Sequence, residues 1–232
     1  MARVAVVTGS NRGIGLAIAE RLVADGFRVV MNGRSRTGLK EARRLGATYV
    51  RADVTNPSGA RKLAAAAPDA DVLVNNVGDF FLTPVEKFEL DKWEELFTSN
   101  LRSAWLVTRE ILPRMRRRKS GVIVNIGGPV AQTVKGNPRF VAYSMSKSAL
   151  VVFTKSLAQA VAAEGVRVNV VNPGFIRTYA YSAEEVREMA PKVPAKRLGE
   201  PADVAGAVAY LASDAAKYVT GAALDVCGGL WV

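Results

Sequence analysis

The sequence contains no histidine and a single cysteine, Cys227, among its 232 residues. The absence of histidine excludes Ser-His-Asp and Cys-His nucleophile systems, histidine general bases and histidine metal ligands. A lone cysteine excludes internal disulfides, Cys-x-x-Cys redox pairs and thiolate zinc sites. Any catalysis therefore depends on Tyr, Lys, Ser, Thr, Asn, Arg or carboxylate side chains, or on a bound cofactor.

Long apolar runs are also absent. No stretch approaches the roughly 18 residues of a membrane-spanning helix, because Lys155, Asp203 and Asp214 interrupt the longest apolar regions. The first residues, 1–5, do not have the layout of a signal peptide. We therefore expect no membrane partner and a cytoplasmic location.

Acidic residues are too few to balance the basic ones. The 21 Asp and Glu residues face 32 Lys and Arg residues, which gives a net charge of +11 and a surface that favours anionic partners. The densest basic run, residues 114–119, is typical of the solvated last turn of a helix, where cations suit the helix dipole. The other basic residues are dispersed and no RNA-binding motif is present, so we expect no nucleic-acid partner.

Short apolar runs alternate with helical patterns along the chain. Strands are predicted at residues 4–7, 27–31, 47–51, 72–74, 122–126, 166–171 and 223–226. Helices are predicted at residues 14–24, 39–45, 57–66, 91–118, 140–163, 183–189 and 201–212, with Asp91 as the N-cap of the fourth. Strands that are apolar on both faces indicate a parallel sheet covered on both sides. We expect an α/β fold, a single-domain, doubly wound Rossmann-type parallel sheet of about seven strands over residues 1–232, with ligands at the carboxyl ends of the strands.

A glycine-rich loop follows the first predicted strand. Its sequence is Thr8-Gly9-Ser10-Asn11-Arg12-Gly13-Ile14-Gly15, a Gly-x-x-x-Gly-x-Gly pattern. Backbone amides in such a loop can approach a pyrophosphate, and the following helix N-terminus favours negative charge. A tight strand–helix turn without a ligand is the alternative.

Together with later motifs, this loop resembles the short-chain dehydrogenase/reductase family over essentially the whole chain. The matching segments are Thr8 to Gly15, Asn75-Asn76-Val77-Gly78 with Val77 in place of alanine, Asn100 within Phe97 to Leu101, Tyr143 to Lys147 as Tyr-x-x-x-Lys, Asn172-Pro173-Gly174 through Thr178, and Thr220-Gly221 with Gly228-Gly229, where Cys227 replaces the usual aspartate. The general pattern is most similar to the 3-oxoacyl-acyl-carrier-protein reductases.

The resemblance implies roles for individual residues. Tyr143 would be the proton donor or acceptor, Lys147 would assist it and hold the nicotinamide ribose, and Asn100 would support a proton-relay water. The implied cofactor-binding residues are Gly9, Ser10, Asn11, Arg12, Gly13, Ile14, Gly15, Arg34, Asp53, Val54, Asn76, Val77, Gly78, Tyr143, Lys147, Pro173, Gly174, Ile176 and Thr178. For Asp53, which matches an adenine-contacting position, capping of a helix is the alternative. No metal is implied.

The spacing of Tyr143 and Lys147 has a physical logic of its own. Residues i and i+4 share a helix face, so both side chains can point into one cleft. A nearby ammonium is expected to stabilise the phenolate and lower the phenol pKa from about 10. The tyrosine can then exchange a proton with an alcohol or carbonyl while a cofactor carries the hydride. Two surface residues without a role are the alternative.

The segment after the second predicted strand bears on cofactor choice. It reads Asn32-Gly33-Arg34-Ser35-Arg36 and has no carboxylate. An acidic residue there would bind the ribose 2′-hydroxyl and select NAD. Arg34 can instead pair with a 2′-phosphate, and Arg12 can reach the same group. We therefore expect NADP, with NAD less favoured. Two solvated arginines are the alternative.

One position departs from the family pattern. Gly128 falls where family members usually carry a serine that hydrogen-bonds the substrate carbonyl, and the neighbouring register candidate, Val130, also lacks a hydroxyl. Gln132 or Thr133 could substitute. Because a missing donor typically costs about 10²-fold or more in rate, Gly128→Ser is expected to raise kcat/KM about tenfold. If the backbone at Gly128 requires a positive φ, which serine resists, the substitution would lower stability and leave the activity unchanged.

These features predict an NADP-dependent oxidoreductase that interconverts a carbonyl and a secondary alcohol on a small molecule or an acyl-carrier substrate. Residues 178–193 correspond to the family's substrate lid, with an aromatic character from Tyr179 and Tyr181. A second hypothesis is a dinucleotide-binding sensor or scaffold with little turnover, because of Gly128. The family commonly assembles through its two long helices, so we expect a homodimer or homotetramer.

Overall fold

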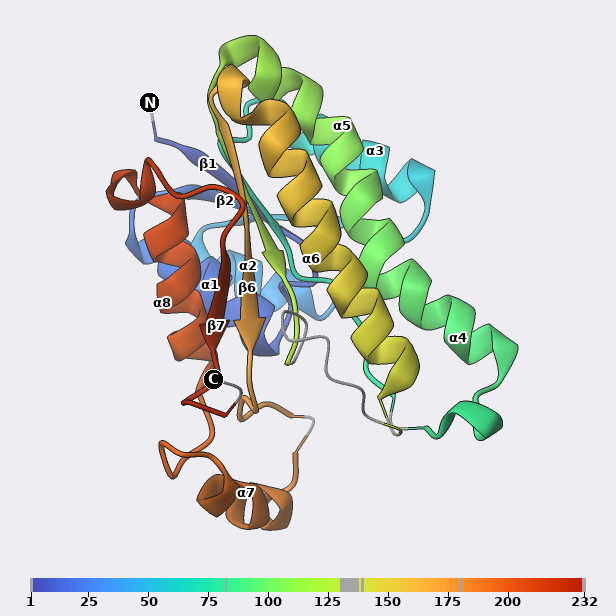
Figure 1. The fold of residues 1–232 in the computed structure, drawn as a ribbon. Coiled ribbons are helices and arrows are strands. Elements are labelled where there is room, and N and C mark those ends of the chain that lie inside the picture. The colour runs from blue at the N-terminus through green and yellow to red at the C-terminus, as the bar shows by residue number, and fades with distance from the viewer. Residues whose placement is uncertain (1, 82, 130–137, 139, 180, 231–232) are drawn as a thin grey trace.

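The computed structural model (Figure 1) describes residues 2–81, 83–129, 138, 140–179 and 181–230. Within them, seven strands form one parallel sheet in the order β3-β2-β1-β4-β5-β6-β7. The strands are β1 (Val4–Val7), β2 (Arg28–Gly33), β3 (Thr48–Arg51), β4 (Val72–Asn75), β5 (Gly121–Ile126), β6 (Val166–Pro173) and β7 (Ala223–Val226). The predicted Rossmann-type parallel sheet is therefore confirmed.

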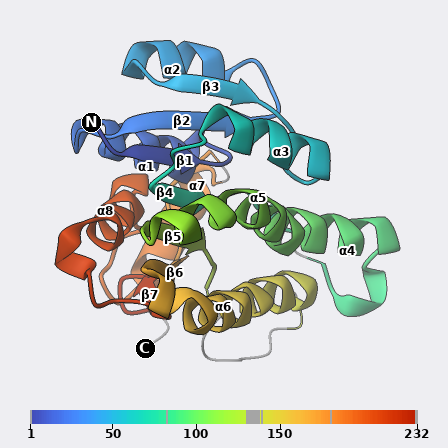
Figure 2. The same cartoon turned by 90° about the horizontal axis from the view of Figure 1, so that it is seen from above.

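Helices cover both faces of the sheet (Figure 2). They are α1 (Gly13–Ala24), α2 (Gly38–Leu45), α3 (Pro57–Ala66), α4 (Leu90–Phe97), α5 (Ser103–Arg118), α6 (Val141–Val161), α7 (Ala183–Met189) and α8 (Pro201–Ala212). One core cluster joins the sheet to α3, α5 and α6, and a second joins it to α1, α2 and α8. In β1 the side chains alternate between them, which explains why this strand is apolar throughout.

The helix predicted over residues 91–118 is broken into two. A π-helical turn, η2 (Thr98–Arg102), separates α4 from α5. Asp91 is not the N-cap: α4 begins at Leu90 after Glu89, and Asp91 lies in the first turn, where a carboxylate suits the helix dipole. Single π-helical turns are frequent at functional sites, and this one contains the buried side chain of Asn100.

Buried amides connect the two central strands to the helices on one face. Asn75 and Asn125 are register partners in β4 and β5. Asn75 Nδ2 donates to Thr108 Oγ1 at 3.0 Å and to Asn125 Oδ1 at 2.9 Å, and Asn125 Nδ2 donates to Thr154 Oγ1 at 2.8 Å. These hydrogen bonds connect α5, β4, β5 and α6 at the carboxyl ends of the strands, where ligands bind in doubly wound sheets.

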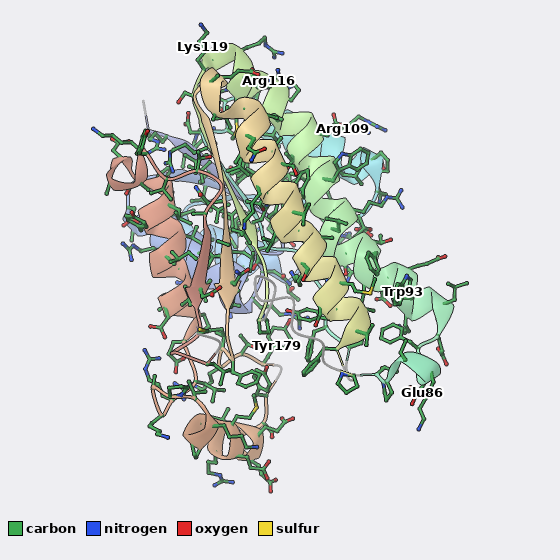
Figure 3. All side chains as sticks on the ribbon, viewed as in Figure 1. Glu86, Trp93, Arg109, Arg116, Lys119 and Tyr179 are labelled. Atoms are coloured by element: carbon green, nitrogen blue, oxygen red, sulfur yellow. The ribbon has the colours of Figure 1, made fainter. Side chains whose placement is uncertain are left out.

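The basic run at the end of α5 has structural partners. Arg114 donates to the Ala64 carbonyl at 2.8 Å, Arg118 to the Ala70 carbonyl at 2.6 Å, and Arg116 pairs with Glu164. Arg116 and Lys119 lie at the top of the molecule in Figure 3, well above Tyr179. Across the described ranges, no helix is long and apolar enough to cross a membrane.

Candidate active site

A cavity of about 960 Å³ opens at the carboxyl ends of the strands, where the strand order reverses between β1 and β4. This reversal is the usual ligand position in doubly wound sheets. The predicted site residues that line the cavity are Gly9, Asn11, Arg12, Gly13, Ile14, Gly15, Arg34, Asp53, Val54, Asn76, Val77, Gly78, Tyr143, Lys147, Pro173, Gly174, Ile176 and Thr178. The fold thus gathers residues from both halves of the chain into one site.

Two predicted site residues do not line the cavity. The Ser10 hydroxyl is buried, donates to the Val7 carbonyl at 2.9 Å and accepts from the Asn32 N–H at 2.9 Å, so it fixes the loop to β1 and β2. Asn100 is also fully buried. Both side chains therefore act on the cavity indirectly, through the neighbouring residues to which they are hydrogen-bonded.

The glycine-rich loop is shaped to admit a ligand close to its backbone. Gly9 and Gly13 have φ values of +60° and +57°, which side-chain-bearing residues rarely adopt. A Cβ at Gly15 would overlap the Gly9 carbonyl and the Asn76 amide. Asn76 Nδ2 donates to the carbonyls of Thr8 and Gly9 at 3.0 and 3.1 Å. The loop is therefore held from β4, and Gly9 and residues 11–15 line the cavity at the start of α1.

Tyr143 and Lys147 lie one turn apart on α6 and both line the cavity, as the i, i+4 spacing predicts. Lys147 is buried and its Nζ donates to the Ile126 carbonyl at 2.9 Å. A Cβ at Gly78 would come within 3.0 Å of Lys147 Nζ and 2.7 Å of Asn100 Oδ1, so only glycine leaves these groups room. The three predicted catalytic side chains therefore share one corner of the site.

Asn100 holds this corner in place. Its Oδ1 accepts from the Asp79 N–H at 2.8 Å, and its Nδ2 donates to Ser146 Oγ at 2.9 Å. The Ser146 hydroxyl in turn donates to the Tyr143 carbonyl at 2.8 Å. Asn100 thereby connects the loop after β4 to the backbone of the tyrosine. Ser146 was missed from the sequence because an interior helix serine gives no signal.

The protonation states differ from those expected. Burial raises the pKa of Tyr143, with a further rise from Tyr181, so the phenol is neutral at physiological pH. Burial lowers the pKa of Lys147 to about 8, partly offset by Asp79. The prediction of a phenolate stabilised by Lys147 is wrong here, because the ammonium is directed at Ile126 and desolvation dominates. A neutral phenol is the form that donates a proton.

Gly128 is buried against the tyrosine, and its φ is not positive, so the alternative that the backbone requires glycine there for a positive φ is wrong. A Cβ there would overlap the Tyr143 hydroxyl and lie 3.0 Å from Tyr143 Cζ and 3.2 Å from Lys147 Cγ. The tyrosine hydroxyl occupies the space that a serine side chain would need. Val130, Gln132 and Thr133 lie outside the described residues.

The part of the cavity next to the end of β2 is polar, and no carboxylate follows this strand in residues 32–36. Arg34 is exposed there, beside the hydroxyls of Ser35 and Thr37, which lie 2.6 Å apart. Asn11 Nδ2 donates to Thr37 Oγ1 at 3.2 Å. Ser35 and Thr37 were missed from the sequence because short polar loop residues are common everywhere.

Asp53 is not a helix cap. Its Oδ1 accepts from the N–H and the hydroxyl of Thr55 at 3.0 and 2.7 Å, whereas Asn56 caps α3 through Gly59. The capping alternative for Asp53 is therefore wrong, and its side chain remains at the cavity.

Aromatic rings close the other end. Phe80 packs edge-on against Tyr143 with ring centroids 4.8 Å apart, and the ring centroids of Phe80 and Phe140 are 5.7 Å apart.

The Arg12 guanidinium stacks over the Tyr179 ring, 3.8 Å from its centroid, so the glycine-rich loop and the segment before α7 are in contact. Phe80 and Phe140 were missed because single aromatic residues in loops carry no periodic signal.

Comparisons with known proteins agree with this geometry. A family model described as Enoyl-(Acyl carrier protein) reductase matches residues 9–231. The 3-oxoacyl-[acyl-carrier-protein] reductase of Salmonella typhimurium is 38% identical over an alignment of 240 residues, which covers 99% of this chain and 98% of that protein. A solved putative betaketoacyl-ACP reductase is 36% identical with a TM-score of 0.91, covering 98% and 97% of the two chains.

A second solved relative is described as a putative NAD(P) dependent gluconate 5-dehydrogenase from Beutenbergia cavernae with bound NADP at low occupancy. It is 37% identical with a TM-score of 0.91, covering 99% of this chain and 97% of that one. The prediction of an oxidoreductase is confirmed, and the expected cofactor agrees with the NADP in that structure. The chain belongs to the short-chain dehydrogenase/reductase family.

Proposed function

We propose that this protein is an NADP-dependent reductase that interconverts a carbonyl group and a secondary alcohol. The observation that carries the proposal is the convergence of Tyr143, Lys147 and the glycine-rich loop on one cavity. Hydride transfer requires a bound nicotinamide, and proton transfer requires a positioned acid next to it. This cavity has room and partners for both.

The residues present fit a phosphorylated dinucleotide. Gly9, Gly13 and Gly15 line the cavity without side chains, which suits close approach of a pyrophosphate to the loop and to the α1 N-terminus. Lys147 would hold the nicotinamide ribose. Arg34 would pair with the 2′-phosphate, and Arg12 would assist it on leaving the Tyr179 ring over which it is stacked. No carboxylate at the end of β2 competes for the 2′ position. When bound, NADPH supplies the hydride.

The neutral Tyr143 phenol is the proton donor in the reductive direction. It would donate to the substrate oxygen as negative charge develops there. Lys147, one helical turn from Tyr143, would assist it by holding the nicotinamide ribose of the bound cofactor. Asn100 acts through Ser146 and the Asp79 N–H to keep the tyrosine and the loop after β4 in register. Phe80 packs edge-on against the Tyr143 ring.

The substrate would enter between the aromatic rings and the region 178–193, which we assign as a lid within a single-domain chain. Tyr181 lines the cavity, and α7 lies in this region with a capping box formed by Ser182 and Glu185. The name of the Salmonella relative makes a 3-oxoacyl group the first substrate to test. We also propose a homodimer or homotetramer, which size-exclusion chromatography with light scattering would test.

Gly128 favours a second candidate, a dinucleotide-binding sensor or scaffold. Gly128 has no hydroxyl at the position where the family usually carries the serine that binds the substrate carbonyl, and such a donor is worth about 10²-fold in rate. The two candidates differ in turnover rather than in cofactor binding. NADPH consumption over a panel of 3-oxoacyl thioesters and simple ketones separates them. Steady turnover of any compound in the panel supports the reductase. Tight NADPH binding with no turnover of any compound in the panel supports the sensor.

A further inference from the structure

Strand β3 holds the loop after β2 by three consecutive carbonyl groups. The Gly33 carbonyl accepts from the Ala52 N–H at 3.1 Å, the Arg34 carbonyl from Arg51 Nε at 3.0 Å, and the Ser35 carbonyl from the Tyr49 hydroxyl at 2.7 Å. All three donors come from β3 or the residue after it. The first bond continues the sheet, whereas the other two are made by side chains beyond the end of the ladder.

The Tyr49 ring also determines which residues the loop can contain. A Cβ at Gly33 would lie 2.5 Å from the Tyr49 hydroxyl, and a Cβ at Gly38 would overlap the ring itself. The ring is half-buried and packs on the core cluster beneath α1 and α2. Both ends of the segment 33–38 are therefore seated on one rigid side chain.

Turning the loop carbonyls toward β3 leaves the loop side chains on the cavity side. Arg34, Ser35 and Thr37 line the cavity, whereas Tyr49 and Arg51 do not. Burial raises the pKa of Tyr49, so its hydroxyl stays protonated and able to donate across the physiological range.

We propose that Tyr49 is a positioning residue for cofactor selection: it holds the loop 33–38 so that Arg34 and its neighbouring hydroxyls meet the 2′-phosphate of NADP. This inference rests on the NADP preference proposed above. It assigns to β3 a role in selectivity although none of the strand's residues, 48–51, lines the cavity. Arg51 supports the same loop through the Arg34 carbonyl.

The test is direct titration of NADPH and NADH into the protein by calorimetry, which needs no substrate. Tyr49→Phe removes one hydrogen bond and keeps the ring. We expect its Kd for NADPH to rise about three- to tenfold, the range of a single net hydrogen bond, with its Kd for NADH changed less than about twofold. Tyr218→Phe is the matched control, because this side chain is 99% exposed and lies outside the cavity lining.

A double-mutant cycle with Arg34→Ala separates positioning from general loosening. If Tyr49 acts through Arg34, Tyr49→Phe weakens NADPH binding by less than about twofold once Arg34 is gone. Full additivity, equal losses for both cofactors, or no loss in the single variant would overturn the inference. A parent protein that binds NADPH and NADH equally would instead refute the NADP preference, before any variant is compared.

A second variant keeps the test informative if Tyr49→Phe folds poorly in thermal denaturation. Arg51→Lys keeps the positive charge at this position but loses the planar guanidinium whose Nε donates to the Arg34 carbonyl. The inference predicts the same selective loss of NADPH affinity. Unchanged selectivity in a folded Arg51→Lys protein would count against it.

Discussion

Replacing Gly128 by alanine and by serine tests the geometry at the centre of the site. The sequence alone predicts a tenfold gain for Gly128→Ser, but the structure places the Tyr143 hydroxyl where the new Cβ would lie. The tyrosine must therefore move in both variants. Displacing a reacting group by about 1 Å costs on the order of 10²-fold in rate, so we expect Gly128→Ala to lose about that much kcat.

The stability of the alanine variant gives an independent measure. Inserting a methyl group into a packed site costs about 1–3 kcal/mol, and each kcal/mol lowers Tm by about 2–4 °C in a chain of this size. We therefore expect Tm to fall by several degrees while the Kd for NADPH stays near the parental value. Differential scanning calorimetry, NADPH titration and initial rates measure the three quantities on the same protein.

Comparing serine with alanine isolates the hydroxyl, because both variants carry the same Cβ. If the site lacks only a donor to the carbonyl, Gly128→Ser should exceed Gly128→Ala by about tenfold in kcat/KM, which is about 1.4 kcal/mol of transition-state stabilisation. An alanine variant with parental Tm and parental rate would refute the reasoning, since the Tyr143 hydroxyl could not then occupy that space.

Three further substitutions or conditions have clear expected outcomes. Arg34→Asp should reverse or abolish the NADPH preference, because attraction to the 2′-phosphate becomes repulsion; equal parental Kd values for NADPH and NADH would contradict this. Lys147 has a pKa lowered to about 8 by burial, so kcat/KM should decline as pH rises through about 8 and the ammonium is lost, while a flat profile up to pH 10 would remove Lys147 from the proton relay. Asn125→Ala should lower the free energy of unfolding, measured by urea titration, by about 1–3 kcal/mol, because the buried Asn75 amide and the buried Thr154 hydroxyl each lose a hydrogen bond. An unchanged urea midpoint would show that water replaces the Asn125 amide.

The fold was accessible from the sequence because strong, repeated signals determine it. Apolar runs such as residues 4–7 have no polar face, which requires cover on both sides of a parallel sheet. Pro57 and Pro201 mark helix starts that the structure reproduces at the same residues. The break at η2 was not predicted, because a π-helical turn needs no special residue and the periodicity continues through it.

The sequence predicted which residues form the candidate site, but it did not predict the contacts that these residues make. Glycines and the Tyr143–Lys147 pair are fixed by spacing, so their positions follow from the motifs. The pKa of Tyr143 could not be predicted, because it depends on burial and on the direction of the Lys147 ammonium. The role of Tyr49 was invisible for the same reason: its partner lies fourteen positions away, on the other side of a sheet ladder.

The most direct test of the account compares the parent with Tyr143→Phe for NADPH consumption on 3-oxoacyl thioesters, with NADPH affinity measured on both. The account predicts turnover by the parent, equal NADPH binding by the two proteins, and loss of at least about 10²-fold in kcat from removal of the donor hydroxyl alone. A Tyr143→Phe variant that turns over near the parental rate would show that the proton comes from another group and would contradict the central claim.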